Sequence, residues 1–223
     1  MMDFEAARVK MVENQIRTTD VTSHSVLNAF FAVPRENFVP EKSKLLAYID
    51  CDIEIAPAAA GKAARFLMEA SPLAKLLQLG VITKEDKVLD VGCGTGYVSA
   101  VLSLIADKVV ALETDEDLAA QAKANLAALG YDNVTVVTGD LEKGHAGSAP
   151  FNVIFVDGSV EQVPQALLDQ LGEDGRLIAV LGFGHAARAT VFMRERGAFS
   201  ENVFFNASIK PLPGFAKAKE FVF

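Results

Sequence analysis

Short apolar runs alternate with helix-like segments through the second half of this 223-residue chain. Strands buried on both faces of a sheet appear as continuous apolar runs, and parallel pairing requires a crossover connection, usually helical. The alternation therefore predicts an α/β fold with a Rossmann-like, doubly wound and mostly parallel sheet. The predicted strands cover residues 88–91, 109–112, 134–137, 153–156 and 177–181, and the predicted helices cover residues 98–106, 116–129 and 163–171.

The two ends of the chain differ from this central pattern. Segments 190–193 and 203–205 flank Arg196-Gly197-Ala198, which predicts an antiparallel C-terminal hairpin at the sheet edge. We expect residues 1–80 to be a mostly helical extension packed on a core domain of residues 81–223. Breaks are expected at the prolines of this extension, Pro34, Pro40, Pro57 and Pro72.

Composition narrows the classes of partner. The net charge is −8 and no Lys/Arg-rich run is present, so we expect no nucleic-acid partner. No apolar run approaches the ~18 residues that a membrane span needs. Two cysteines, Cys51 and Cys93, make neither a disulfide framework nor a metal cluster, and the N-terminus lacks the pattern of a secretory signal. We therefore expect a cytoplasmic protein with reduced thiols.

The most informative local feature is the glycine-rich turn Asp90-Val91-Gly92-Cys93-Gly94-Thr95-Gly96, which follows the first of these strands. Glycines let backbone N–H groups approach a ligand closely. The dinucleotide fingerprint G-x-G-x-x-G would need a glycine where this chain has Tyr97, and no Lys-Ser/Thr pair follows for a nucleoside triphosphate. The pattern D-x-G-x-G-x-G instead resembles the first motif of the S-adenosylmethionine-dependent methyltransferases. Asp90 suits the cationic groups of that methyl donor.

Two further acids follow later strands. Glu113 ends the second strand, about 20 residues beyond the turn, where a ribose-binding carboxylate is expected; the alternative is a solvated acid at a strand end. Asp140 follows the third strand and could accept a hydrogen bond from an adenine amino group, although Gly-Asp by itself is more often a simple turn. Because carboxyl ends of parallel strands share one edge, these groups should lie together. The predicted cofactor-binding residues are Asp90, Gly92, Cys93, Gly94, Gly96, Glu113, Thr114, Asp140 and Leu141.

Several segments, most of them N-terminal, resemble one family. MVENQIR at 11–17, VLNAF at 26–30, VPRENFVP at 33–40 and AYID at 47–50 are similar to the opening segments of the protein-L-isoaspartate O-methyltransferases, and the final Phe221-Val222-Phe223 is also similar. The resemblance covers most of the chain. It implies the seven-stranded sheet of the class I methyltransferases, S-adenosylmethionine as cofactor, and methyl transfer to isoaspartyl carboxylates in damaged proteins, a repair reaction.

One segment departs from this family where its chemistry is carried out. The family reads approximately G-Q-T-I-S-Q-P, with the serine hydroxyl at the methyl-transfer site, whereas this chain reads Gly61-Lys62-Ala63-Ala64-Arg65-Phe66-Leu67. No catalytic residue of the family can therefore be assigned here. Arg65 could hold a carboxylate substrate bidentately. The alternative, which we favour from the sequence, is a solvated helix residue whose stem covers apolar surface.

A second departure follows the fourth strand. Val156-Asp157-Gly158-Ser159 stands where the family has a small apolar or hydroxyl-rich turn. Asp157 is a candidate general base or substrate contact, or one ligand of a Mg²⁺ ion. A metal site would need a further Asp/Asn pair, which residues 182–185 do not offer. The histidines His24, His145 and His185 form no close-spaced ligand set, so we expect no metal.

Three functions remain compatible with these features. The leading hypothesis is an S-adenosylmethionine-dependent O-methyltransferase acting on isoaspartyl residues of a protein or peptide. Such an enzyme mainly orients a carboxylate that is already nucleophilic. The second is a small-molecule methyltransferase of the same fold, with Arg65 and Asp157 in new roles. The third is a non-catalytic protein that binds the cofactor.

Overall fold

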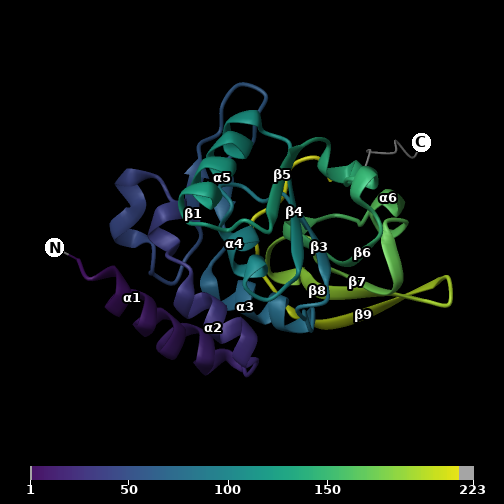
Figure 1. Ribbon diagram of the computed structural model, residues 1–223, viewed down its shortest axis with the longest axis horizontal. Coiled ribbons are helices and arrows are strands. Elements are labelled where there is room, and N and C mark those ends of the chain that lie inside the picture. The colour runs from purple at the N-terminus through teal and green to yellow at the C-terminus, as the bar shows by residue number, and fades with distance from the viewer. Residues whose placement is uncertain (1, 216–223) are drawn as a thin grey trace.

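A seven-stranded sheet in the order β5-β4-β3-β6-β7-β8-β9 forms the centre of the computed structural model, which describes residues 2–215 (Figure 1). The first five strands in that order pair in parallel, and β8 and β9 complete the sheet as an antiparallel hairpin. The predicted sheet and hairpin are confirmed; the terminal residues 221–223 lie outside the described part. The strands are β3 Lys87–Val91, β4 Lys108–Glu113, β5 Val134–Thr138, β6 Phe151–Val160, β7 Leu171–Leu181, β8 Arg188–Glu195 and β9 Ala198–Asn206.

The two faces of the sheet carry different apolar layers, because successive side chains of a strand point to opposite faces. On one face, Val109 and Ala111 of β4 join a large cluster with the helices α3 (Ala70–Leu79), α4 (Tyr97–Ser103) and α5 (Glu116–Ala128). On the other face, Val110 and Leu112 pack with α6 (Gln165–Leu168) and the segment after β9. Figure 1 shows α4 and α5 on one side of the sheet and α6 on the other.

Within the parallel part of the sheet, β6 and β7 extend furthest beyond the residues that the sequence predicts. β6 continues to Val160, so the expected turn at Asp157-Gly158 is instead a bulge in the strand. The pairing with β7 moves there from Phe155 opposite Ile178 to Ser159 opposite Val180. β7 begins at Leu171, which pairs with Phe151, and the helix predicted over residues 163–171 shortens to α6. Strand pairing accounts for the C-terminal end of this change, because the Phe151 N–H donates to the Gln170 carbonyl and Leu171 begins β7. At the other end, α6 begins only after Pro164, whose backbone is extended.

The N-terminal segment is helical only in part. It contains α1 (Phe4–Met11), a π-helical turn at Val12–Ile16, α2 (His24–Ala32), and 3-10 turns at Arg17–Thr19, Arg35–Phe38 and Glu41–Leu46. The strands β1 (Ile53–Ala56) and β2 (Arg65–Leu67) then form a separate antiparallel pair, which the expectation of a mostly helical extension missed. Pro72 does not break α3, because it lies in the first turn, where no backbone N–H is required. The division at residue 80 stays a prediction.

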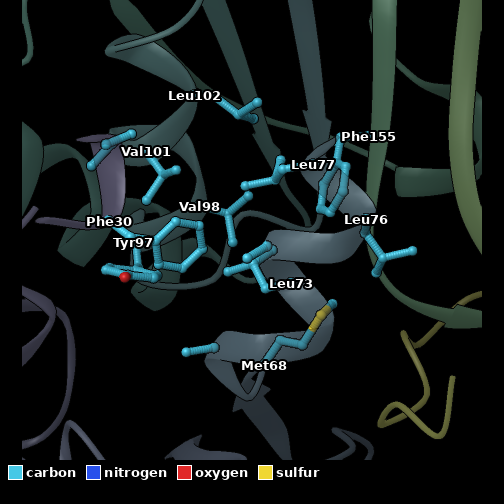
Figure 2. Packing of buried hydrophobic residues seen from close by; sticks show 14 of the residues in the cluster. Phe30, Met68, Leu73, Leu76, Leu77, Tyr97, Val98, Val101, Leu102 and Phe155 are labelled. Carbon is cyan, nitrogen blue, oxygen red and sulfur yellow. The ribbon is translucent and has the colours of Figure 1, made fainter. Parts of the chain in front are cut away.

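Tyr97 joins the N-terminal segment to the glycine-rich turn. Its ring is fully buried and meets the rings of Phe30 and Phe38 edge-on, at centroid distances of 6.3 and 5.7 Å. Figure 2 shows Phe30 beside Tyr97, together with apolar side chains of α3 and α4 such as Leu73 and Val98. The guanidinium of Arg35 lies 4.7 Å from the ring centroid and donates to the carbonyls of Ala47 and Met68. An aromatic residue at position 97 is thus required by packing.

Tyr97→Ala should lower the free energy of unfolding by about 3–5 kcal/mol, because it empties a buried aromatic site and removes the face on which Arg35 lies. Urea unfolding followed by circular dichroism measures the loss. Phe204→Ala is a suitable control, since Phe204 is 53% exposed on β9 and its loss should stay within about 0.5 kcal/mol. Equal losses for the two variants would contradict this account.

Candidate functional site

The predicted site residues come from four strands whose carboxyl ends share one edge of the sheet. Asp90 lies near the end of β3, and Glu113 is the last residue of β4. Asp140 follows β5, while Asp157 follows Val156 of β6, which pairs with Val91 of β3. The parallel register therefore gathers acids that are far apart in the sequence, as the sequence analysis predicts.

The backbone of the glycine-rich turn is held by the chain itself. Gly92, Gly94 and Gly96 have φ angles of 87°, 55° and 96°, a conformation that favours glycine. The N–H groups of Gly92 and Cys93 donate to the carbonyl of Leu112, at 2.8 and 3.1 Å. Cys93 is buried, and burial together with nearby carboxyl groups raises the pKa of its thiol well above the usual value. The thiol therefore stays protonated and is a poor nucleophile.

Glu113 is the most heavily hydrogen-bonded acid of the site, and its side chain is fully buried. Its two oxygens accept from Nη1 and Nη2 of Arg65, at 2.6 and 2.9 Å. They also accept from the backbone N–H groups of Gly94, Thr114 and Asp115, at 2.8, 2.9 and 3.1 Å. A carboxylate offers about four lone-pair positions, so both oxygens of Glu113 are saturated. The alternative of a solvated strand-end acid is wrong, while the ribose role stays a prediction.

Arg65 is not the solvated helix residue that we favour from the sequence. It begins β2, is 6% exposed, and also donates through Nη2 to the carbonyl of Gly92 at 3.1 Å. A buried guanidinium needs an opposite charge, and its partner stands 48 residues later in the chain. Sequence reasoning has no local signal for such a pair.

Removing either partner of the Arg65–Glu113 pair alone should lower the free energy of unfolding by about 3–5 kcal/mol, because it leaves a buried charge without compensation.

Asp90 and Asp157 are two further acids beside this ion pair. Asp90 is fully buried, and only one of its oxygens is used: Ser99 Oγ donates to Oδ2 at 2.5 Å, and Oδ1 has no partner among the described residues. Desolvation raises the pKa of Asp90 to about 7, against the opposing effect of the Ser99 hydrogen bond. Desolvation and the charge of Asp90 raise the pKa of Asp157 well above its usual value, although part of that residue is accessible. A cationic ligand group would suit this cluster.

Two adjoining hollows open at the same edge. One, of about 250 Å³, is lined in part by Arg65, Thr114 and Pro213. The other, of about 470 Å³, is lined by Thr114 and Pro213 together with Asp140 and Leu141. The larger volume lies within the range of about 300–1,000 Å³ that is typical of small-ligand sites, and the smaller lies just below it. Thr114, Asp140 and Leu141 thus lie together beside open space, while their role in binding a cofactor stays a prediction. Asp140 is exposed and ion-paired with Lys143.

The segment after β9 also reaches this edge, a contact that the sequence pattern does not predict. Ser159 exchanges backbone hydrogen bonds with it, donating to the carbonyl of Lys210 and accepting from the N–H of Leu212. The Leu212 side chain lies against Gly92 so closely that a Cβ at Gly92 would be 2.5 Å from its Cδ1. The proline-flanked leucine Pro211-Leu212-Pro213 is the only sequence signal for this contact. Gly92 is therefore needed for packing as well as for its turn.

The remaining expectations concern metals and membranes. No group of three or more His, Cys, Asp or Glu side chains in residues 2–215 is arranged to hold a metal ion. The three histidines lie apart, His24 at the start of α2, His145 beside Ser148, and His185 in a 3-10 turn. None of the helices in the same range is long and apolar enough to cross a membrane.

The raised pKa of Asp90 predicts a pH-dependent stability. The folded protein keeps this proton up to about pH 7, whereas an unfolded chain releases it near pH 3.9, so ionisation of Asp90 destabilises the fold as the pH rises through this window. Asp90→Asn should remove this loss, because the amide oxygen still accepts from Ser99. The free energy of unfolding of Asp90→Asn, relative to that of the native protein, should therefore increase between pH 5 and pH 7, by about 1.4 kcal/mol per pH unit at most.

Thermal unfolding across this pH range tests the effect. Asp140→Asn is the matched control, since Asp140 is exposed and no comparable pH-dependent gain is expected. A constant difference between Asp90→Asn and the native protein at every pH would contradict the proposed titration of Asp90.

Comparison with known proteins supplies the family. The model of the protein-L-isoaspartate(D-aspartate) O-methyltransferase family matches residues 6–211. A protein-L-isoaspartate O-methyltransferase of Koribacter versatilis is 35% identical over 211 residues, which cover 95% of this chain and 92% of that protein.

Solved structures agree with this match. A protein-L-isoaspartate O-methyltransferase with 28% identity superposes with a TM-score of 0.82, covering 93% of this chain and 66% of the other. A Plasmodium falciparum protein, described as a putative protein-L-isoaspartate O-methyltransferase in complex with S-adenosyl-L-homocysteine, has a TM-score of 0.77 at 19% identity and shares the fold; the match covers 95% of this chain and 99% of that one. By sequence and by structure, this chain belongs to the protein-L-isoaspartate O-methyltransferase family.

Proposed function

We propose that this protein transfers the methyl group of S-adenosylmethionine to the free carboxylate of isoaspartyl residues in proteins. The family match over residues 6–211 is the observation that carries this proposal. The Plasmodium falciparum structure contains S-adenosyl-L-homocysteine, which is the demethylated form of the same cofactor. The acidic side chains gathered at the sheet edge support the same proposal on physical grounds.

The residues of this edge fit the cofactor with one rearrangement. Asp90 Oδ1 is an acceptor without a partner in the described structure, and it suits the cationic end of the cofactor. Thr114, Asp140 and Leu141 border the larger hollow, where an adenine can be accommodated. Glu113 is at the place of a ribose acceptor, but its oxygens are occupied by Arg65. When bound, S-adenosylmethionine supplies an electrophilic methyl group on a sulfonium centre.

The work left to the protein is mainly orientation. A substrate carboxylate is already ionised and nucleophilic at neutral pH, so no general base is required, and holding it in line with the methyl group lowers the barrier. Because no general base is required, the role left for Asp157 is to contact the substrate, and burial raises the pKa of its carboxyl group well above the usual value. Arg65 stands where the family has its serine.

Location and partners complete the proposal. Cys51 and Cys93 are both free thiols, which agrees with a reducing compartment such as the cytoplasm. The net charge of −8 favours neither nucleic acid nor an anionic membrane surface as a partner. Damaged proteins or peptides with isoaspartyl residues are the substrates that we propose.

The activity is tested with a synthetic peptide that contains one isoaspartyl residue. We expect methyl incorporation from labelled S-adenosylmethionine into this peptide and none into the same peptide with ordinary aspartate, because only the isoaspartyl form presents the free α-carboxylate. Calorimetric titration with S-adenosyl-L-homocysteine checks that the protein is folded and binds the cofactor. Background incorporation by protein that passes this check would refute the proposed function.

The cofactor assignment has its own test at Asp140. Asp140→Ala should weaken S-adenosyl-L-homocysteine binding by about tenfold, the loss of one hydrogen bond worth about 1.4 kcal/mol. Glu142→Ala is the matched control, because Glu142 borders the same hollow and carries the same charge but has no assigned contact. Similar affinities for the two variants would remove Asp140 from the binding site.

A further inference from the structure

Arg65 and a ribose cannot use Glu113 at the same time. Both Glu113 oxygens already accept from the guanidinium, and three backbone N–H groups donate to the same two oxygens, so no acceptor position is left for a ribose. If Glu113 binds the ribose hydroxyls, as we infer, Arg65 must first leave. The ion pair between Arg65 and Glu113 therefore belongs to the cofactor-free state of the protein.

The segment that carries Arg65 lies outside the seven-stranded sheet, although Ile53 and Leu67 anchor it in the large apolar cluster. β1 and β2 are only four and three residues long and form a sheet of their own, separate from the seven-stranded one. Two ion pairs fasten this hairpin to the end of β4 and the residues after it. One is the buried pair of Arg65 with Glu113; the other, at 2.7 Å, joins the 55% exposed side chain of Lys62 to that of Asp115, which is 17% exposed. Partly exposed pairs of the second kind stabilise little.

A guanidinium released from Glu113 needs a new anion, because a buried and unpaired cation is strongly unfavourable. Arg65 borders the smaller hollow at the edge where the cofactor residues gather. An isoaspartyl substrate carries the group that matches it, a carboxylate, which a guanidinium holds with two parallel hydrogen bonds. Each carboxylate oxygen keeps a second lone pair in such a pair, so the oxygen can still attack the methyl carbon.

We propose that Arg65 is the residue that recognises the substrate carboxylate, and that it exchanges Glu113 for this carboxylate when the cofactor ribose takes Glu113. The inference rests on the proposed function. It replaces the hydroxyl of the family's serine with a cation, and it makes cofactor binding the event that creates the substrate site. Binding of the two ligands is then coupled, and the coupling is reciprocal.

Calorimetry on the full chain tests the exchange, with S-adenosyl-L-homocysteine and an unmethylated isoaspartyl peptide as ligands. For the native protein we expect the peptide to bind at least about tenfold more tightly when S-adenosyl-L-homocysteine is saturating, and the peptide to tighten S-adenosyl-L-homocysteine binding by the same factor. Independent binding of the two ligands would overturn the exchange.

Variants assign the effect to Arg65. Arg65→Gln should bind S-adenosyl-L-homocysteine as tightly as the native protein or more tightly, because Glu113 no longer has to give up a partner, while the peptide KM rises about 10- to 100-fold. Arg65→Lys should recover part of the peptide affinity. Lys44→Gln, which cuts only the surface pair of Lys44 with Glu41 and lies outside the lining of both hollows, should leave both affinities within about threefold. An unchanged peptide KM in Arg65→Gln would overturn the role of Arg65.

Hydrogen exchange on the native protein covers the case in which Arg65→Gln does not fold. Saturating S-adenosyl-L-homocysteine should speed amide exchange in residues 57–66, and further addition of the peptide should slow it again. Slower exchange with S-adenosyl-L-homocysteine alone would show that Arg65 stays fixed and would overturn the proposal. If the native protein methylates the peptide while these signatures are absent, only the exchange fails; if it neither binds nor methylates the peptide, the proposed function fails as well.

Discussion

A guanidinium buried against a carboxylate holds together the edge of the sheet on which this protein depends. Arg65 brings the β1–β2 hairpin to Glu113 at the end of β4, and both residues also bond to the glycine-rich turn, through the carbonyl of Gly92 and the N–H of Gly94. Three segments are thus fixed by one ion pair. Because neither charge is stable alone in this surrounding, the pair makes the conformation of the whole edge sensitive to any ligand that competes for either partner.

The same edge gathers three acidic side chains around the buried guanidinium of Arg65. Glu113, Asp90 and Asp157 all influence one another, and Arg65 is the positive group that opposes them. The raised pKa values of Asp90 and Asp157 follow from this arrangement, since burial disfavours their charged forms and one guanidinium cannot compensate three carboxyls. A cofactor with a sulfonium and an ammonium group would bring the missing positive charge, so the site is complementary to its ligand before binding.

The N-terminal segment packs against the glycine-rich turn of this edge. Phe30, Phe38 and Arg35 converge on Tyr97, and Thr95 Oγ1 donates to the carbonyl of Phe38 at 2.5 Å. The family signature around Arg35 therefore acts on the glycine-rich turn through packing. The packing around Tyr97 also explains why an aromatic residue follows the turn. This residue stands where the dinucleotide fingerprint would need a glycine.

Short-range patterns were enough to predict the sheet, its C-terminal hairpin, and the gathering of Asp90, Glu113 and Asp140 at one edge, because strand alternation, turn glycines and parallel register depend on neighbouring residues and simple topology. The family resemblance also rests on short sequence segments. Tertiary structure alone decided that Asp157 lies in a bulge of β6, that Leu212 closes over Gly92, and that Arg65 is buried against Glu113. These three features join residues that are distant in the chain, and the pairing of a buried charge depends on which partner the fold brings within reach.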